Sequence, residues 1–315
     1  MAVTDVPMPA SIRLADRVPF LRAKRDELKD FLDSVTTPRM PGVRIDYAHP
    51  VGDPGPQGPD SMSWKVLRHL PVVMAGAGTA VLLEMIDKHV GAGVSQFSSY
   101  REDPIARLRG TLSPAYAMAY APSGFAEDIA KRIKARHNGI EGQAFDGTDY
   151  KAIDADLFSW VHATAIFGFM SAYARYVDPA VSMADRDRYI EEASGFAETI
   201  GCRVVPKRWS DILDYFEDYR KTGQLSHTPY VEEFKDSALH SKHAPLGSGG
   251  WLLQASYTML PDWSVDYVKP EYSKRDRILG DLMVRTGMKT LNWLVPDDVP
   301  ATACARVGVP VAQIS

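Results

Sequence analysis

From about residue 60 onward, apolar residues recur at the three-to-four-residue spacing of one face of an α-helix. This pattern predicts helices at residues 71–89, 124–137, 157–174, 183–199, 210–221 and 275–294. Alternating apolar runs of the kind that strands require are few, and only residues 140–150 favour a small hairpin, with Asp146-Gly147 as its turn. The pattern indicates an all-α fold, a mostly helical single domain with minor β structure.

Residues at the predicted helix ends support these boundaries. Pro71 suits the first turn of its helix, Ser123 is a candidate N-cap, and Asn138-Gly139 supplies a left-handed stop. Gly76 and Gly78 lie inside the first helix without the third small residue and preceding strand of a dinucleotide-binding motif. We therefore expect these two glycines to permit close helix packing.

The N-terminal part of the chain has a different composition. Residues 36–60 are crowded with proline and glycine, which exclude helix and strand interiors. We expect residues 1–62 to form an N-terminal helix and a Pro/Gly-rich arm packed on a helical domain at residues 63–315. A later glycine-rich stretch, Gly247 to Gly250, favours a surface loop, with a flexible lid as the alternative.

The segment 157–174 is the most apolar stretch of the chain. Its eighteen residues contain two titratable side chains, His162 and Tyr173. The length allows a membrane-spanning helix. However, polar residues such as Ser159 and Thr164 are scattered through it, and aromatic and basic flanks do not mark both ends. We therefore predict the central helix of a helical domain, not a membrane span.

Composition narrows the function classes. The chain has 45% hydrophobic and 24% charged residues, which is ordinary for a globular protein. A formal net charge of −4 gives no electrostatic reason to expect a nucleic-acid partner. Cys202 and Cys304 imply neither a disulfide framework nor a zinc site. The first thirty residues are interrupted by many charges, so a cytoplasmic protein without a leader is expected.

His162 differs from the other histidines in its apolar setting. Phe158, Ile166 and Phe169 share its helical face, with Tyr173 continuing the stripe. A flat macrocycle could pack on such a wall while one ring nitrogen binds its iron. The alternative is a core histidine that is hydrogen-bonded to a neighbouring carbonyl oxygen. Spacing does not decide between these two interpretations.

A set of short motifs occurs in the order and spacing of a known family. They include Gly52-Asp-Pro-Gly-Pro-Gln-Gly-Pro-Asp-Ser61, Gly76-Ala-Gly78, Asp103-Pro104, Arg107 with Thr111, Tyr150-Lys-Ala152 and Trp160-Val-His-Ala-Thr164. Over about residues 50 to 230 the chain resembles the family that contains the latex clearing protein, a rubber oxygenase, and the MpaB oxygenase. The resemblance implies a helical fold with a globin-like core and a haem b oxygenase that cleaves carbon–carbon double bonds.

The resemblance also implies roles for individual residues. His162 would be the proximal iron ligand, with Phe158, Ile166 and Phe169 against the haem. Arg107 and Thr111 would lie near the distal face, where a guanidinium and a hydroxyl can stabilise negative charge on dioxygen. Without the resemblance, these two residues would be read as a surface arginine and a capping threonine that ends a helix before Pro114.

The chain departs from the family pattern on the distal side. Gly110 stands where the rubber oxygenase has a lysine that can occupy the sixth iron position, so the iron is expected to be open or held by water. Asp87-Lys88 and Phe97-Ser98 stand where relatives have His-Pro and His-Ser. Glu84, Lys88 and His89 then become the candidates for acid–base chemistry, although Glu84 and Lys88 also have the spacing of a solvated ion pair.

Together these observations predict a haem-dependent oxidoreductase, an oxygenase or oxidase of an apolar or partly apolar small molecule, with dioxygen as a further partner. One alternative is a haem-dependent dehydrogenase or hydroxylase that leaves double bonds intact, which the mass of the product would reveal. Another is a non-catalytic haem-binding, lipid-binding or gas-sensing protein, which would not consume oxygen steadily. In a third, no haem binds and His162 is structural.

Overall fold

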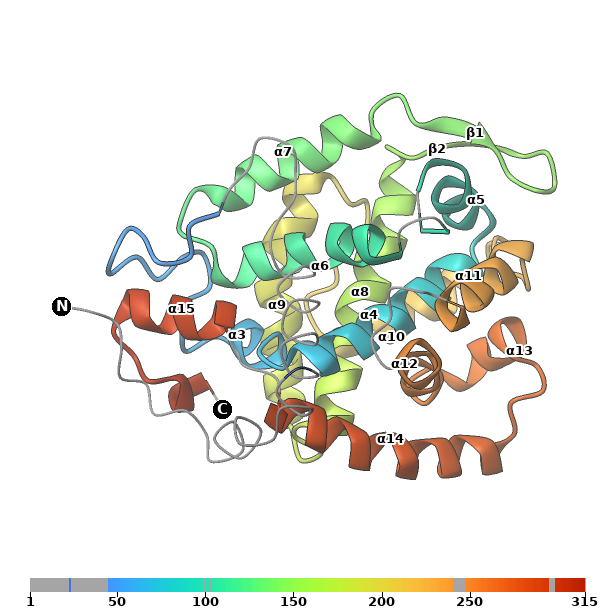
Figure 1. Ribbon diagram of the computed structural model, residues 1–315. Coiled ribbons are helices and arrows are strands. Elements are labelled where there is room, and N and C mark those ends of the chain that lie inside the picture. The colour runs from blue at the N-terminus through green and yellow to red at the C-terminus, as the bar shows by residue number, and fades with distance from the viewer. Residues whose placement is uncertain are drawn as a thin grey trace.

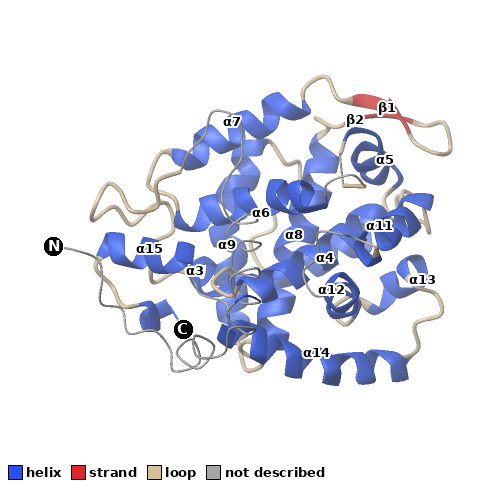
Figure 2. Ribbon diagram, in the orientation of Figure 1, coloured by secondary structure: helices blue, strands red, loops and turns tan. Residues whose placement is uncertain are grey.

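The computed structural model describes residues 23, 45–98, 100–101, 104–240, 248–294 and 298–314. Helices make up nearly all of the regular structure in these residues, and the one sheet is a two-stranded hairpin (Figures 1 and 2). The prediction of an all-α fold is thus confirmed. The elements in chain order are α3 (Met62–Val66), α4 (Leu70–Met85), α5 (Lys88–Phe97), α6 (Pro104–Tyr120), α7 (Phe125–His137), β1 (Glu141–Gln143), β2 (Asp149–Lys151), α8 (Ala155–Tyr176), α9 (Met183–Ile200), α10 (Trp209–Arg220), α11 (Pro229–Leu239), α12 (Ser248–Tyr257), the 3-10 helix η2 (Asp262–Ser264), α13 (Val265–Val268), α14 (Lys274–Leu294), α15 (Asp298–Val307) and the 3-10 helix η3 (Val311–Ile314).

The helices predicted at residues 157–174, 183–199, 210–221 and 275–294 correspond to α8, α9, α10 and α14, with their ends shifted by at most two residues. The predicted hairpin is present too. Its strands pair antiparallel with Gly142 opposite Tyr150, and Gly147 adopts the positive φ of +81° that the turn requires. The hairpin packs on α5 (Figure 1).

The helix predicted at residues 71–89 is two helices. The first, α4, ends at Met85, and α5 begins at Lys88 because Asp87 caps it. The buried Asp87 carboxylate accepts hydrogen bonds from the backbone amides of His89 and Val90, at 2.9 and 2.8 Å. A carboxylate that lies inside the predicted helix therefore starts a new one.

The N-cap predicted for α7 is wrong. Gly124, in a left-handed conformation with φ of +90°, occupies the cap position, and no side chain caps this helix. Ser123 instead binds the Asp53 carboxylate through its amide and its hydroxyl, at 3.0 and 2.8 Å. The predicted stop at Asn138-Gly139 is present, since Asn138 is the C-cap and Gly139 has φ of +86°.

Several helical segments were not predicted from the pattern. Helix α6 continues through Pro114 to Tyr120, so the proline does not end it. Helix α11 begins with a proline in its first turn at Pro229. Residues 248–250, predicted as part of a surface loop, form the first turn of α12, while Gly247 lies outside the described residues.

The centre of the fold is the crossing of α4 and α8, which make the most extensive contact between any two elements (Figure 1). Gly76 and Gly168 face each other there. A Cβ atom at Gly76 would lie 2.7 Å from the carbonyl oxygen of Gly168, and a Cβ at Gly168 would lie closer still to the carbonyl oxygen of Gly76. Gly78, two residues later and on another face of α4, meets Ser256 of α12. The expected use of Gly76 and Gly78 in close helix packing is confirmed.

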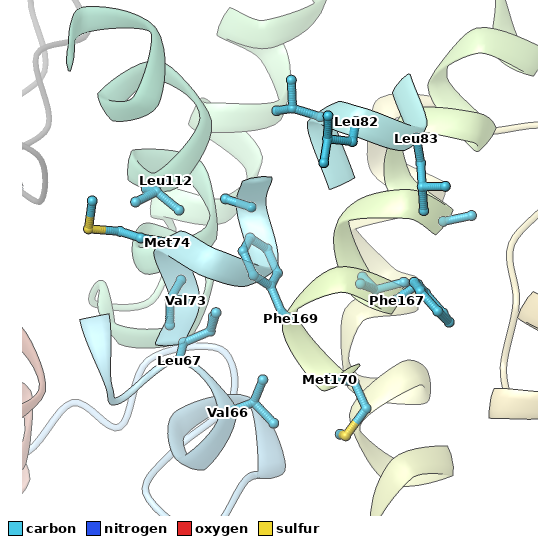
Figure 3. Close-up of a cluster of buried hydrophobic side chains, with 14 of the residues drawn as sticks. Val66, Leu67, Val73, Met74, Leu82, Leu83, Leu112, Phe167, Phe169 and Met170 are labelled. Carbon is cyan, nitrogen blue, oxygen red and sulfur yellow. The ribbon is translucent and has the colours of Figure 1, made fainter. Parts of the chain in front are cut away.

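Helix α8 runs through the middle of the molecule. Among the described helices it is the one long and apolar enough to cross a membrane by length and composition, and 72% of the window that meets these criteria is buried in the protein. Its side chains reach neighbours on opposite sides. Phe167 stacks on Trp209 at 5.3 Å between ring centroids, whereas Phe169 points toward α4 and α6 (Figure 3). The helix therefore contributes to the core on several faces.

Residues 45–61 form an irregular arm that is bound to the C-terminal part of the chain. The Arg306 guanidinium is buried and donates to the carbonyl oxygens of Asp53, Tyr47 and Tyr120 at 2.7, 3.0 and 2.8 Å. The amide of Gly52 in turn donates to the carbonyl oxygen of Arg306 at 2.7 Å. The arm and α15 thus pack as one unit against α6. The N-terminal helix expected earlier in the chain lies outside the described residues.

The glycine crossing predicts unequal effects of two alanine substitutions. Gly168→Ala would force a methyl group into the backbone of α4, so we expect a loss of about 3 kcal/mol or more in the free energy of unfolding. Gly195, within α9, offers open space to a Cβ atom, so Gly195→Ala should gain roughly 0.5–1 kcal/mol. Urea unfolding of both variants measures this difference, and equal stabilities would contradict the crossing.

Candidate functional site

The imidazole of His162 lies inside the protein in the first half of α8. Asp154 caps this helix by accepting the amide of Asp156 at 2.8 Å, which fixes where the first turn begins. His162 is 7% exposed, and its Nε2 atom is buried with no hydrogen-bond partner among the described residues. The interpretation of His162 as a core histidine bonded to a carbonyl oxygen therefore finds no support at Nε2.

Burial also fixes the charge state of this ring. Desolvation lowers the pKa of His162 from 6.5 to about 4, so the imidazole is neutral near pH 7. A neutral ring has a lone pair on one nitrogen, and that lone pair is what a metal ion requires. His162 therefore has the charge state and the unpartnered nitrogen of a metal ligand.

The apolar stripe predicted around His162 is present. Phe158, Ile166 and Phe169 are 6%, 5% and 5% exposed, whereas Trp160 and Ala163 on other faces of α8 are fully buried. The three side chains beside His162 are thus apolar and buried. Figure 3 shows Phe169 directed toward Val73 and Met74 of α4 and Leu112 of α6. The wall beside the imidazole is apolar on several elements.

A buried ion pair lies between α4 and α6. The guanidinium of Arg107 approaches the carboxylate of Glu84 at 3.7 Å, and the Glu84 side chain is 3% exposed. Burial raises the pKa of Glu84, with the positive charge of Arg107 opposing the change. Burial likewise lowers the pKa of Arg107, with Glu84 opposing. Desolvation of both groups is the main electrostatic feature of this part of the protein.

Arg107 keeps unused hydrogen-bonding capacity. Its Nε atom is buried without a partner among the described residues. Arg107 is half-buried, and 28% of its side chain is accessible to water. The predicted alternative of a surface arginine is wrong, because Arg107 pairs with a buried carboxylate.

Contacts among four helices bring Arg107 close to the first half of α8, the helix that carries His162. Trp160, two residues before His162, donates through Nε1 to the carbonyl oxygen of Leu83 at 3.2 Å, and Glu84 follows directly. On the other side, Phe158 meets the ring of His137 edge-on at 5.6 Å. The charge of Arg107 is one cause of the lowered pKa of His137. The C-terminal ends of α4 and α7 and the first halves of α6 and α8 therefore meet around one site.

Thr111 and Gly110 lie next to Arg107 on α6. The Thr111 hydroxyl donates to the carbonyl oxygen of Arg107 one turn earlier, at 3.2 Å. Because α6 continues beyond Pro114, Thr111 does not end the helix, and the capping alternative is wrong. Gly110 is exposed, and a Cβ atom there would meet open space. No side chain projects from this position.

Two of the three acid–base candidates lie elsewhere. Lys88 forms an ion pair with Asp146 at 2.7 Å, and the Nε2 atom of His89 is 3.0 Å from the Thr148 hydroxyl. Both contacts are made to the hairpin. The expected solvated pair between Glu84 and Lys88 is wrong, because Glu84 is buried and faces Arg107. Glu84 alone of the three belongs to the site.

His137 is a site residue that the sequence did not reveal. It is the last residue of α7, half-buried, and its Nδ1 atom is 2.8 Å from the carbonyl oxygen of Ile133. Burial is the largest cause of its lowered pKa, followed by the charges of Arg136 and Arg107, while the bond to Ile133 opposes them. In the sequence it reads as a cation at the end of a polar helix face, and its contact with Phe158 is a tertiary feature.

The donor set of the site suits one kind of metal group. Within the described ranges, no three His, Cys, Asp or Glu side chains are grouped as a metal ion would require. A bare metal ion is usually held by three or four protein ligands. A porphyrin supplies four nitrogens itself and needs one axial imidazole from the protein. His162 on its apolar wall fits that requirement.

Comparison with known proteins identifies the family. The family described as "ER-bound oxygenase mpaB/B'/Rubber oxygenase, catalytic domain" matches residues 64–293. The chain therefore belongs to this family, and its resemblance to the rubber oxygenase and MpaB is confirmed. As a member of an oxygenase family it is an oxidoreductase of the oxygenase class. No curated protein and no solved structure matches the chain significantly.

The lowered pKa of His162 makes a prediction about stability. Between about pH 6.5 and pH 4 the unfolded chain binds a proton at this imidazole and the folded protein does not, so stability falls as the pH falls. The effect amounts to about 3 kcal/mol over this range. His162→Gln should remove it. Chemical unfolding of the metal-free wild type and variant at pH 7 and pH 4.5 measures the difference, and parallel losses would show that His162 is not desolvated.

Proposed function

We propose that this chain is a haem b-dependent oxygenase that acts on an apolar or partly apolar small molecule, with dioxygen as co-substrate. The observation that carries the proposal is the buried Nε2 atom of His162, which is neutral and has no described hydrogen-bond partner. Membership of an oxygenase family supports the same reaction class. A second observation, the accessible Arg107 beside buried Glu84, supports a polar reaction centre within an apolar site.

His162 would hold the haem iron through Nε2. Its neighbours Phe158, Ile166 and Phe169 would pack against the macrocycle, because these side chains share one face of α8 and form an apolar wall. When bound, the haem would supply the activation of dioxygen, which the amino-acid side chains of the site cannot carry out themselves. The apolar wall would keep water away from the reacting atoms.

Arg107 would stabilise negative charge as it develops during the reaction. Its Nε–H has no described acceptor, so the donor needs no rearrangement before it can bind oxygen atoms. Glu84 holds Arg107 from one side and keeps the guanidinium charge inside the protein. Because burial raises its pKa, the Glu84 carboxyl can also hold a proton and exchange it with the substrate.

Thr111 would support this arrangement from the next turn of α6. Its hydroxyl hydrogen is committed to the carbonyl oxygen of Arg107, so its oxygen can accept a hydrogen bond without losing that contact. Gly110 provides no side-chain ligand, which would leave the distal side open to dioxygen or water. The substrate would then be selected mainly by the apolar lining, which suits an apolar or partly apolar molecule.

The first test is the visible absorption spectrum. We expect the purified protein, or the protein after addition of haemin, to show a Soret band that is lost or strongly shifted in His162→Ala. His89→Ala is the matched control, because that ring contacts the hairpin, and its spectrum should equal that of the wild type. A protein that remains colourless after haemin addition would refute the assignment of the cofactor.

The second test concerns Arg107. Arg107→Ala should retain the Soret band but lose about a hundredfold in dioxygen consumption with an apolar alkene, because one charge-stabilising donor is removed. Arg101→Ala is the control, since Arg101 pairs with Glu233 outside the site. Full oxygen consumption in Arg107→Ala would show that the guanidinium plays no part in the reaction. Arg107→Ala removes the donor and also leaves the Glu84 carboxylate unpaired. Comparing Glu84→Gln with the wild type shows how much oxygen consumption is lost when the ion pair alone is broken.

A further inference from the structure

Helix α14 carries a row of exposed apolar side chains on its outer face. Ile278, Leu279, Leu282 and Met283 are 70%, 55%, 67% and 56% exposed. Their spacing of one, three and four residues places them on the same side of the helix. Other large exposed apolar residues, such as Leu213 and Met183, belong to separate helices. The residues on α14 therefore form a continuous patch, which single exposed side chains do not.

The outer face cannot turn inward, because polar contacts hold α14 along its length. Arg277 donates to the carbonyl oxygens of Thr258 and Leu260 at 3.1 and 2.6 Å. Farther along, Asp281 accepts from both Arg175 and Arg285 at 2.7 Å. These contacts fix the rotation of the helix about its axis.

The inner face is fully used in packing. Val284 and Met288 are completely buried, and they belong to the cluster that joins α14 to α4, α8 and α12. Gly280 and Gly287 lie so close to Gln254 and Trp251 of α12 that a Cβ atom would collide with them. The helix lies along the outer edge of the molecule (Figure 1). Exposure of the apolar row is thus a fixed property of the fold.

The charges around the row are basic. Arg275 lies one turn before Ile278, and Lys289 lies beyond Met283 on the same side, both of them exposed. Lys274 adds a third exposed cation at the start of the helix. The acidic residue nearest this face, Asp276, lies at its edge and accepts the amide and hydroxyl of Ser273. An apolar row with cations at both ends matches an anionic lipid surface.

Charge also argues against a second copy of the chain on this face. Two copies paired by a two-fold axis would place the same surface on both sides. Whether the helices ran parallel or antiparallel, Arg275 and Lys289 would face cations of the partner, which is unfavourable. A headgroup layer with negative charge has no such conflict.

We propose that the outer face of α14 (Arg275, Ile278, Leu279, Leu282, Met283, Thr286 and Lys289) binds the surface of a membrane that contains anionic lipids. The apolar side chains insert among the acyl chains near the headgroups, and the cations contact phosphate groups. The helix lies flat on the surface and does not cross the bilayer. This property is independent of the cofactor and of the reaction that the site performs.

The test is flotation of the full-length protein with vesicles of phosphatidylcholine that contain about one third phosphatidylglycerol. Wild type should float with these vesicles, and Ile278→Ser/Leu282→Ser should lose about tenfold or more of the bound fraction. Leu213→Ser, which removes an exposed apolar side chain from α10, is the matched control and should bind like the wild type. All three proteins should share one thermal midpoint by circular dichroism, since these side chains are exposed.

A charge variant tests the headgroup contacts separately. Arg275→Ser/Lys289→Ser should weaken binding to the phosphatidylglycerol vesicles and remove most of its salt dependence, with little change on pure phosphatidylcholine. The proposal is overturned if the wild type does not float, or if the Ile278→Ser/Leu282→Ser variant floats equally well. It is also overturned if the wild type sediments as a dimer that this same variant dissociates, because a second copy would then cover the face.

Discussion

The close crossing of α4 and α8 is the constraint on which the rest of the structure depends. Two glycines, Gly76 and Gly168, allow the backbones to touch, and no other residue fits at either position. This contact fixes how far each helix slides along the other. The carbonyl of Leu83 then meets the indole of Trp160, and Glu84 lies beside the first half of α8. The position of the site relative to His162 follows from that register.

The site itself is unfavourable for stability, which is a reason to assign it a function. Buried polar groups in folded proteins are nearly always hydrogen-bonded. Here the Nε2 atom of His162 and the Nε atom of Arg107 have no described partner, and Glu84 is desolvated against a guanidinium 3.7 Å away. Apolar residues of similar size would cost less. Desolvated titratable groups of this kind are common where a protein binds or converts something.

Much of the fold could be predicted from the sequence because helical periodicity is local. The long helices and the Asp146-Gly147 hairpin follow from spacing and turn residues, and they are present. Features that depend on distant partners could not be predicted. Asp87 starts a helix only because the chain turns there, and α6 continues through Pro114.

The candidate site likewise combines local features, which could be predicted, with contacts between distant residues, which could not. Phe158, Ile166 and Phe169 could be placed beside His162 from helical spacing alone. The pairing of Glu84 with Arg107 joins two helices, so sequence spacing suggested Lys88 instead. The contact between His137 and Phe158 likewise joins α7 to α8, and no local pattern indicates it.

The bonds of Arg306 have a consequence for how the proline-rich arm and α15 fold. The family match covers residues 64–293, and the proline-rich arm and α15 lie on either side of it in the sequence. These flanks hold one another, since a guanidinium near the C-terminal end binds carbonyl oxygens 253 and 259 residues earlier. Deleting either flank would leave buried polar groups of the other without hydrogen-bond partners. The arm therefore stays incomplete during synthesis until α15 has been made, about 250 residues later.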